Sequence, residues 1–284
     1  MTNKAFRASD YPSEATAFVR ATCLEVAAAL GALMENLVVV GGLVPTFLID
    51  QDEIDDPADQ YPGTTDLDIA LTFGIPDRDR QSEIASRLRS AGFSPQLNSD
   101  GRLAGHRWEF PGLGRVRVDF LIPPPHPGDR TTELIRLGDD FAAQVTDGLD
   151  LAFRDTVRTR IAGKTFAGAD ASFDIIVCGP GAFVVLKALA FRGRGENKDA
   201  HDLYYVVRHF GAGAGDVADR LRPLLPDANA QRAIQILRDD FTDYDGRGPL
   251  AVARFTRGGP DEDVQADVVG FVGEFLRQIS NSST

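Results

Sequence analysis

Apolar residues recur at helical spacing near the N-terminus and then form one short continuous run. Over residues 15–33 they fall on one face of a helix. The run Leu37–Val40 ends at Gly41-Gly42, which predicts a buried strand and a tight turn. A short helix is expected over residues 43–49.

Shorter apolar or alternating segments predict the rest of a sheet. The acidic stretch 50–60, closed by Tyr61-Pro62-Gly63, predicts a solvated loop before them. A polar-faced helix is expected over residues 80–91. The predicted strands lie at residues 66–73, near Phe93, and at 106–110, 115–122, 149–153, 156–161 and 174–178.

After Pro180 the pattern becomes helical. Helices are expected over residues 182–191, 198–209, 217–225, 229–241 and 264–279. The sequence therefore predicts an α+β domain over residues 1–178, with a mixed sheet and helices, and a C-terminal helical bundle over residues 179–284.

Composition narrows the class of protein. The net charge of −12 argues against a protein that coats nucleic acid non-specifically, because phosphate backbones bind basic faces. Basic residues still gather at 154–164 and 187–198, so a locally basic groove stays open. Cys23 and Cys178 match no metal spacing and are expected to be buried apolar residues. No signal peptide and no apolar run approaching about 18 residues is visible, so a cytoplasmic protein without a membrane span is expected.

Two carboxylates stand two residues apart in Thr64-Thr65-Asp66-Leu67-Asp68. On a strand, such side chains point to the same face. A pair of hard carboxylates suits Mg²⁺, which prefers oxygen ligands and substrate phosphates. Two exposed carboxylates on an edge strand are the alternative interpretation.

Gly41 and Gly42 precede this pair in sequence. Successive glycines let backbone N–H groups approach a phosphate, and the N-terminus of a following helix adds partial positive charge. An ordinary turn between a strand and a helix would also account for them.

Asp119 is a charged residue in the core-like strand Val118-Asp119-Phe120-Leu121-Ile122. As a structural residue it would need an ion-pair partner, for which Arg115 and Arg117 are candidates. As a functional residue it would complete a three-carboxylate site that can bridge two metals and activate an attacking hydroxyl. Both interpretations are open at this point.

The order of strand, Gly-Gly, helix, acidic-pair strand and later strand carboxylate resembles the nucleotidyltransferase superfamily of DNA polymerase β. This resemblance implies a polymerase β-like core that uses Mg²⁺ and takes an NTP as substrate. Gly41 and Gly42 would hold the triphosphate, and Thr65 would stand at a phosphate contact. The implied metal ligands are Asp66, Asp68 and Asp119.

The C-terminal half is similar to the AbiEii group, toxins of type IV toxin–antitoxin systems, and to the related MenT enzymes. The similarity lies in the segment 183–192 and in Lys198-Asp199-Ala200-His201-Asp202-Leu203. It implies that this half completes the active site through Lys187, Lys198, Asp199 and Asp202.

The same motifs can be interpreted from their charges. Lys187 and Arg192, on one predicted helix, can supply positive charge to a triphosphate. Alternatively, Asp199 serves the helix dipole, and Asp202 pairs with Arg192 or Arg194. Two histidines, His126 and His209, are expected to face solvent, and nothing assigns His201 a proton.

Together these features predict a nucleotidyltransferase that transfers NMP from an NTP to an acceptor hydroxyl. The resemblance implies that the acceptor is RNA, at a tRNA 3′ end, that the protein is a toxin, and that a cognate antitoxin is its partner. One alternative is a small-molecule acceptor such as a cationic antibiotic, which the acidic surface would attract. Another is a degenerate domain that binds nucleotide or a partner without turnover, against which the three carboxylates argue.

Overall fold

The chain forms two compact units. The computed structural model describes residues 6–12, 14–72, 78–97, 103–110, 116–125, 131–138 and 141–281. The sheet unit comprises Ser13–Val44 and Gly63–Cys178. The helical unit comprises Met1–Pro12, Pro45–Pro62 and Gly179–Thr284.

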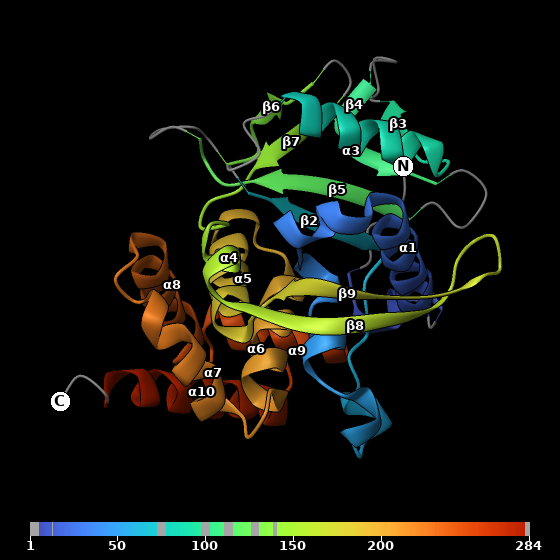
Figure 1. Cartoon of the computed structure of the whole chain (residues 1–284). Helices are drawn as coiled ribbons and strands as arrows, with labels where there is room; N and C mark the ends of the chain where they lie inside the picture. Colours follow the sequence, from blue (N-terminus) through green and yellow to red (C-terminus); the bar gives the residue numbers. More distant parts are fainter. Residues whose placement is uncertain are drawn as a thin grey trace. The chain divides into compact units, whose positions relative to one another are not determined.

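The sheet unit is built on a mixed sheet (Figure 1). Its strand β1 (Leu37–Val40) runs antiparallel to β2 (Asp66–Leu71) and parallel to β9 (Asp170–Cys178). The strand β5 (Arg117–Ile122) runs parallel to β2. The described strands follow the order β3-β4-β5-β2-β1-β9-β8, and β7 pairs with β5 and with β6. The other bounds are β3 (Ser94–Leu97), β4 (Leu103–Glu109), β6 (Leu134–Arg136), β7 (Ala142–Val145) and β8 (Thr156–Lys164). With the helices described below, this sheet confirms the α+β class.

Helix α1 (Ala15–Leu30) buries its apolar face in the core of the sheet unit. Val19, Cys23 and Val26 are fully buried along it. The helix packs on β8, β9 and α3 (Arg78–Ser90). Together with the 3-10 turn that follows, it forms a helix over Ala15–Asn36 that is long and apolar enough to cross a membrane by length and composition. Its contacts with the sheet identify it as a core helix instead.

One predicted strand is wrong. Residues 149–153 were expected to be extended, but α4 (Leu151–Arg154) is a helical turn. Leu151 and Ala152 are buried there, and an apolar run this short fits either a strand or a helical turn. The short strands β6 and β7 had no clear pattern in the sequence.

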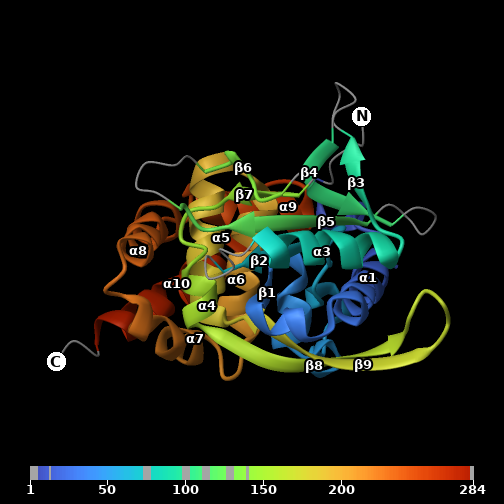
Figure 2. The same ribbon diagram turned by 45° about the horizontal axis from the view of Figure 1, so that its top comes forward.

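The helical unit contains the five helices expected after Pro180 and one more (Figures 1 and 2). The extra helix α9 begins at Arg247 and carries Gly248-Pro249 in its first turn. Glycine and proline together suggest a break, although proline is tolerated at the start of a helix. The bounds are α5 (Pro180–Arg194), α6 (Asn197–His209), α7 (Ala214–Leu221), α8 (Ala228–Phe241), α9 (Arg247–Arg257) and α10 (Glu262–Ser280).

The acidic stretch 50–60 is not a freely solvated loop. It contains two short 3-10 turns, Gln51–Glu53 and Pro57–Asp59. The side chain of Asp59 accepts a hydrogen bond from Arg208 of α6 at 3.0 Å. The stretch contains no lysine or arginine, so the cation that pairs with Asp59 comes from α6, far along the chain. Upstream of it, the helix expected over residues 43–49 shrinks to one turn, α2 (Pro45–Leu48).

Candidate functional site

Two of the three predicted carboxylates lie side by side in the sheet unit. Asp68 of β2 pairs in register with Asp119 of the parallel strand β5. Asp66, two residues earlier on β2, pairs with Arg117. Because alternate residues of a strand share a face, the three carboxylates project from the same face of the sheet. Leu67 and Ile69, on the other face, are fully buried.

Each of the two outer carboxylates is held by an arginine through two hydrogen bonds. The guanidinium of Arg117 donates to both oxygens of Asp66, each at 2.8 Å. The guanidinium of Arg107 on β4 donates to both oxygens of Asp119, each at 2.7 Å. Asp119 therefore has the ion-pair partner that a strand carboxylate needs, but the partner is not one of the two expected. Arg117 pairs with Asp66, and Arg115 lies outside the described residues.

The carboxylates around Arg107 shift the pKa of its guanidinium. Its hydrogen bonds to Asp119, and the nearby charges of Asp66 and Asp68, raise the pKa of the guanidinium further above its ordinary value, against the effect of burial. Such planar two-point pairs are the strongest arginine–carboxylate contacts. Arg107 thus sits within the field of all three carboxylates.

Gly41 follows directly after β1, the strand that pairs with β2, and lies against the carboxylate face of the sheet. Its φ of 72° lies in the left-handed region that favours glycine. A β-carbon added there would stand 1.9 Å from an oxygen of Asp68. The Gly41-Gly42 turn therefore packs directly against the Asp68 carboxylate. The structure offers a close backbone approach at this point, while the single turn of α2 is too short to supply a helix dipole.

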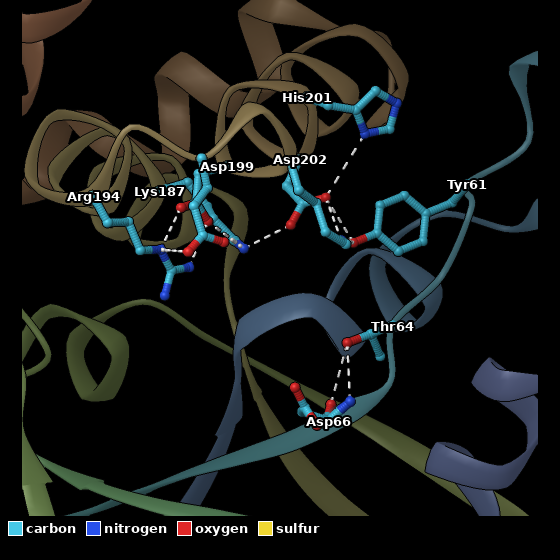
Figure 3. A network of polar contacts seen from close by, with 10 residues as sticks. Tyr61, Thr64, Asp66, Lys187, Arg194, Asp199, His201 and Asp202 are labelled. Carbon is cyan, nitrogen blue, oxygen red and sulfur yellow. Dashed lines mark hydrogen bonds and ion pairs between the residues drawn. The ribbon is translucent and has the colours of Figure 1, made fainter. Parts of the chain in front are cut away.

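The donor set here is all oxygen, as magnesium prefers, but its arrangement does not fit a three-carboxylate centre. Both oxygens of Asp66 and of Asp119 already accept hydrogen bonds from arginine. Within the described ranges, no group of three or more His, Cys, Asp or Glu side chains is arranged to hold a metal ion. Thr65 is exposed, and the Thr64 hydroxyl contacts the backbone of Asp66 (Figure 3).

A second cluster of predicted residues lies inside the helical unit, which we call the Lys187 cluster. The ammonium of Lys187, on α5, donates to Asp202 at 2.6 Å and to Asp199 at 3.1 Å (Figure 3). Arg194 donates to both oxygens of Asp199, at 2.6 and 2.8 Å. The remaining oxygen of Asp202 accepts from Lys198 at 2.7 Å. The cluster comprises Lys187, Arg194, Lys198, Asp199, Asp202 and Tyr61.

Burial makes the charges of this cluster depend on one another. The side chain of Asp202 is 0% exposed and that of Lys187 is 10% exposed. Burial alone would raise the pKa of Asp202, but the ammonium groups of Lys187 and Lys198 hold it well below its ordinary value. Burial pulls the pKa of Lys187 down, and the carboxylates of Asp202 and Asp199 more than reverse this, so its pKa is raised. For Lys198, burial prevails and the pKa is lowered.

The structure also separates residues that the sequence grouped together. Arg192 points to α8, where it pairs with Asp240 at 2.9 Å and with Asp239 at 3.4 Å rather than with the carboxylates of the Lys187 cluster. Asp199 lies in the first turn of α6, but its carboxylate is bound by Arg194 and Lys187 and does not merely serve the helix dipole. Of the two arginines considered for Asp202, neither is its partner; both of its cations are lysines.

Of the described histidines, His201 lies beside the Lys187 cluster, next to Asp202. His201 is buried, and burial lowers the pKa of its imidazole. Its Nδ1 lies 3.7 Å from Asp202 and has no hydrogen-bond partner. His209 is half-buried rather than solvent-facing, stacks on Tyr205, and has its pKa lowered to about 4 by burial. His126 lies outside the described residues.

Sequence reasoning missed Tyr61. Its hydroxyl joins the Lys187 cluster through Lys198 and Asp202. Tyr61 is separated from Asp202 by 141 positions, and only its place at the end of an acidic loop marked it. No periodicity or motif could have paired the two.

Comparisons with known proteins add little to this geometry. No family model matches the chain, and no curated protein matches its sequence. One solved structure to which it is similar is an antigenic nucleotidyltransferase-like protein from Paracoccidioides brasiliensis, at 13% identity and a TM-score of 0.38. The match covers 78% of this chain and 89% of that one. A likeness of this size does not establish a shared activity.

Proposed function

We propose that this chain is a nucleotidyltransferase that transfers NMP from an NTP, taken as its Mg²⁺ complex, to an acceptor hydroxyl. The observation that carries the proposal is the pairing of Asp68 with Asp119 on neighbouring strands, with the Gly41 backbone packed against Asp68. This is the order of turn, acidic-pair strand and third strand carboxylate that the resemblance to the polymerase β superfamily rests on.

In the proposed reaction, the acceptor oxygen attacks the α-phosphorus, the bond to the β-phosphate breaks, and pyrophosphate leaves. The backbone of Gly41 and Gly42 and the exposed Thr65 hydroxyl bind phosphate oxygens. Asp119 takes the proton of the acceptor hydroxyl. Magnesium bound with the nucleotide would neutralise phosphate charge, held by Asp68 and by Asp66 and Asp119 once their arginines release them.

Asp119 can act as a base only when its oxygens are released by Arg107. Both oxygens accept hydrogen bonds from that guanidinium, so neither is open to the acceptor hydroxyl while the pair is intact. The released guanidinium would suit phosphate oxygens, which arginine binds through two points. In the same way, Arg117 donates to both oxygens of Asp66 and would be released when Asp66 binds the metal. We therefore propose that binding of Mg·NTP exchanges the partners of both arginines.

Residues of the helical unit also belong to the proposal. Lys187, Lys198, Asp199 and Asp202 form one buried, charged network, and such networks cluster at functional sites as well as in structural cores. Their loss should lower transfer activity. Arg192, paired with Asp240, is the residue of the predicted set with the least support.

For the acceptor we propose RNA, with a tRNA 3′ end as the first substrate to test, a toxin role in the cytoplasm, and a cognate antitoxin as partner. Because the net charge is −12, RNA binding should be local and depend weakly on salt, with roughly 2–4 phosphates contacted. The same acidity favours the second candidate, transfer to a cationic small molecule such as an aminoglycoside.

The test is to incubate the protein with each α-labelled NTP, Mg²⁺ and either total RNA or a panel of aminoglycosides and lincosamides. Label in RNA would support the first acceptor, and label in the drug alone would support the second. Asp68→Asn should lower transfer on the order of 10²-fold, as removal of other electrostatic groups does. Asp174→Asn is the matched control, because Asp174 is an exposed carboxylate on β9 that pairs with Arg160.

The proposal fails if a folded protein binds Mg·NTP but transfers no label to either class of acceptor, which would favour the non-enzymatic alternative. Unchanged Mg·NTP affinity in Asp68→Asn by calorimetry would remove this residue from the site.

A further inference from the structure

The segment Pro45–Pro62 fastens to one helix of the helical unit by side-chain contacts. The Gln51 amide oxygen accepts from the Tyr205 hydroxyl at 3.0 Å and from the Tyr61 backbone N–H at 2.9 Å. Asp59 accepts from Arg208 at 3.0 Å. Tyr205 and Arg208 both belong to α6. The segment is thereby fixed along this helix, and Tyr61 is carried to the position where α6 presents Lys198 and Asp202.

At that position the Tyr61 hydroxyl uses its hydrogen-bonding capacity in both directions. It accepts from the Lys198 ammonium at 2.6 Å and donates to Asp202 Oδ1 at 2.8 Å. Lys198 donates to the same Asp202 oxygen at 2.7 Å, which closes a ring of three groups. The ammonium also stands 4.7 Å from the centre of the Tyr61 ring and 5.5 Å from that of Tyr11. One tyrosine thus fixes both the distance and the direction of the Lys198 side chain.

Lys198 is a buried cation that shares its carboxylate with another cation. Lys187, Lys198 and Arg194 face Asp199 and Asp202, and Arg194 also lies 3.8 Å from Glu196. Arg194 is the most exposed of the cations, with 55% of its side chain accessible, whereas Lys198 has 15%. A buried charge without full compensation is costly. Lys198 shares its carboxylate with Lys187, and its remaining close acceptor is the neutral hydroxyl of Tyr61.

We propose that Tyr61 is a positioning residue for the proposed transfer reaction. Its hydroxyl supports the Lys198 ammonium in its charged form and fixes its direction, and this ammonium serves the proposed transfer from a negatively charged nucleotide. Tyr61 itself need not touch the substrate. This inference rests on the proposed function for its catalytic consequence, but the contact it describes exists without substrate and can be tested alone.

The chain offers a matched pair of variants. Tyr61→Phe removes the hydroxyl between Lys198 and Asp202. Tyr205→Phe removes a hydroxyl that ties the same segment to the same helix through Gln51, without touching Lys198. If Tyr61 merely anchors the segment, the two variants should behave alike. If it positions Lys198, they should differ.

The first readout needs no activity. The sequence has lysine at four positions only, 4, 164, 187 and 198. Protein labelled with ¹³C at lysine Cε therefore gives few signals, and Lys198 is assigned by its loss in Lys198→Arg. The charged or titratable groups around its ammonium are Asp202, Asp199, Lys187, His201, Tyr61 and Tyr11. In Tyr61→Phe the Lys198 titration should move to lower pH, because the ammonium loses an acceptor; in Tyr205→Phe it should stay as in the wild type.

The second readout is kinetic. Tyr61→Phe should raise KM for the nucleotide about 10-fold, the loss expected for one hydrogen bond to a charged group, and shift the alkaline limb of the kcat/KM profile to lower pH. Tyr205→Phe should leave both near the wild-type values. Thermal melts accompany both variants.

Equal Lys198 titrations in the two variants would overturn the inference, whether both move or neither does. Should Tyr61→Phe fail to fold, wild-type protein labelled with ¹³C at tyrosine Cζ decides instead. The sequence has five tyrosines, and the Tyr61 signal should shift as Lys198 titrates. A Tyr61 signal that is independent of the Lys198 titration would also overturn the inference. If no acceptor is ever labelled, the proposed function fails, while the lysine titration still decides whether Tyr61 holds Lys198.

Discussion

Replacing Lys187 by methionine should destabilise the protein by about 3 kcal/mol. Methionine preserves most of the volume of the side chain, so packing is a minor part of the loss. What is lost is the buried ammonium that bonds Asp202 at 2.6 Å and Asp199 at 3.1 Å. Removing one partner of a buried ion pair costs roughly 3–5 kcal/mol. The lower end is expected because Asp199 keeps Arg194 and Asp202 keeps Lys198.

Urea unfolding with a matched control measures this loss. Lys164→Met is the control, since Lys164 pairs with Asp170 while 67% and 87% of the two side chains are exposed. Such a surface pair contributes about 0–1 kcal/mol. The reasoning is refuted if Lys187→Met loses no more unfolding free energy than Lys164→Met. Unfolding should be followed by two probes, because two compact units need not unfold together.

The difference between wild type and Lys187→Met should depend on pH in a defined way. The pKa of Lys187 is raised from its ordinary 10.5, so its contribution to stability is full below pH 10.5 and is lost as pH rises through the raised value. The pKa of Asp202 is lowered from 3.8, so its contribution is present above pH 3.8 and is lost as pH falls through the lowered value. The difference should therefore be widest between these two values and shrink in acid.

Stability also decides how a loss of activity is interpreted. If Lys187 contacts the triphosphate, its removal should lower kcat/KM on the order of 10²-fold. Lys187 is also a buried ion-pair partner, so its removal could lower activity by unfolding the protein. A lower kcat/KM is therefore assigned to catalysis only where the variant is shown to be folded in the assay buffer. Full activity in a folded variant would remove Lys187 from the site.

Two further variants, each with a matched control, test the Gly41 turn and the Arg107–Asp119 pair of the sheet unit. Gly41→Ala should lower the free energy of unfolding in urea by about 1–3 kcal/mol, because the φ of 72° and the approach to Asp68 leave no room for a β-carbon. Gly193→Ala is the control. Gly193 lies inside α5 with open space around it, so this change should be neutral or stabilising. Without nucleotide, the Arg107→Gln variant should bind Mn²⁺ about 10-fold more tightly than the wild type, because the change releases both oxygens of Asp119. Electron paramagnetic resonance measures the affinity. Equal affinity would contradict the idea that Arg107 and the cation compete for Asp119. Arg160→Gln, which frees an exposed carboxylate on the β8–β9 ribbon, should leave Mn²⁺ binding unchanged.

Local pattern was sufficient to predict most elements near the candidate site. The apolar run Leu37–Val40 and the strand that starts at Asp66 were placed within a residue or two of their bounds, because each run is bordered by glycine or by charge. The neighbouring placement of Asp68 and Asp119 agrees with the expectation of a shared carboxylate face. The strand pairing itself is a long-range fact that periodicity does not encode.

The partners of the charged residues on the sheet could not be predicted. Arg107 and Asp119 lie on adjacent strands, and their pairing follows from the β4–β5 register, which no sequence spacing gives. Arg117, the obvious neighbour of Asp119 in sequence, turned out to serve Asp66. Helix α9 was not predicted. It carries Gly248 where a β-carbon would lie 2.4 Å from the Phe241 ring, a long-range packing requirement that the local pattern does not encode.

The charge pairing limits how a nucleotide can bind. Asp66 and Asp119 each already have an arginine partner in the sheet unit. A free nucleotide offers these arginines new anions but leaves the two carboxylates unpaired, and a free cation does the reverse. Either exchange alone is costly where groups are partly buried. A nucleotide and its metal arriving together satisfy both sides at once, so their binding should be mutually reinforcing. On this argument, calorimetry should show Mg·NTP binding more tightly than NTP in EDTA by at least about 10-fold, and weakly coupled binding would mean that the arginines keep their carboxylates throughout.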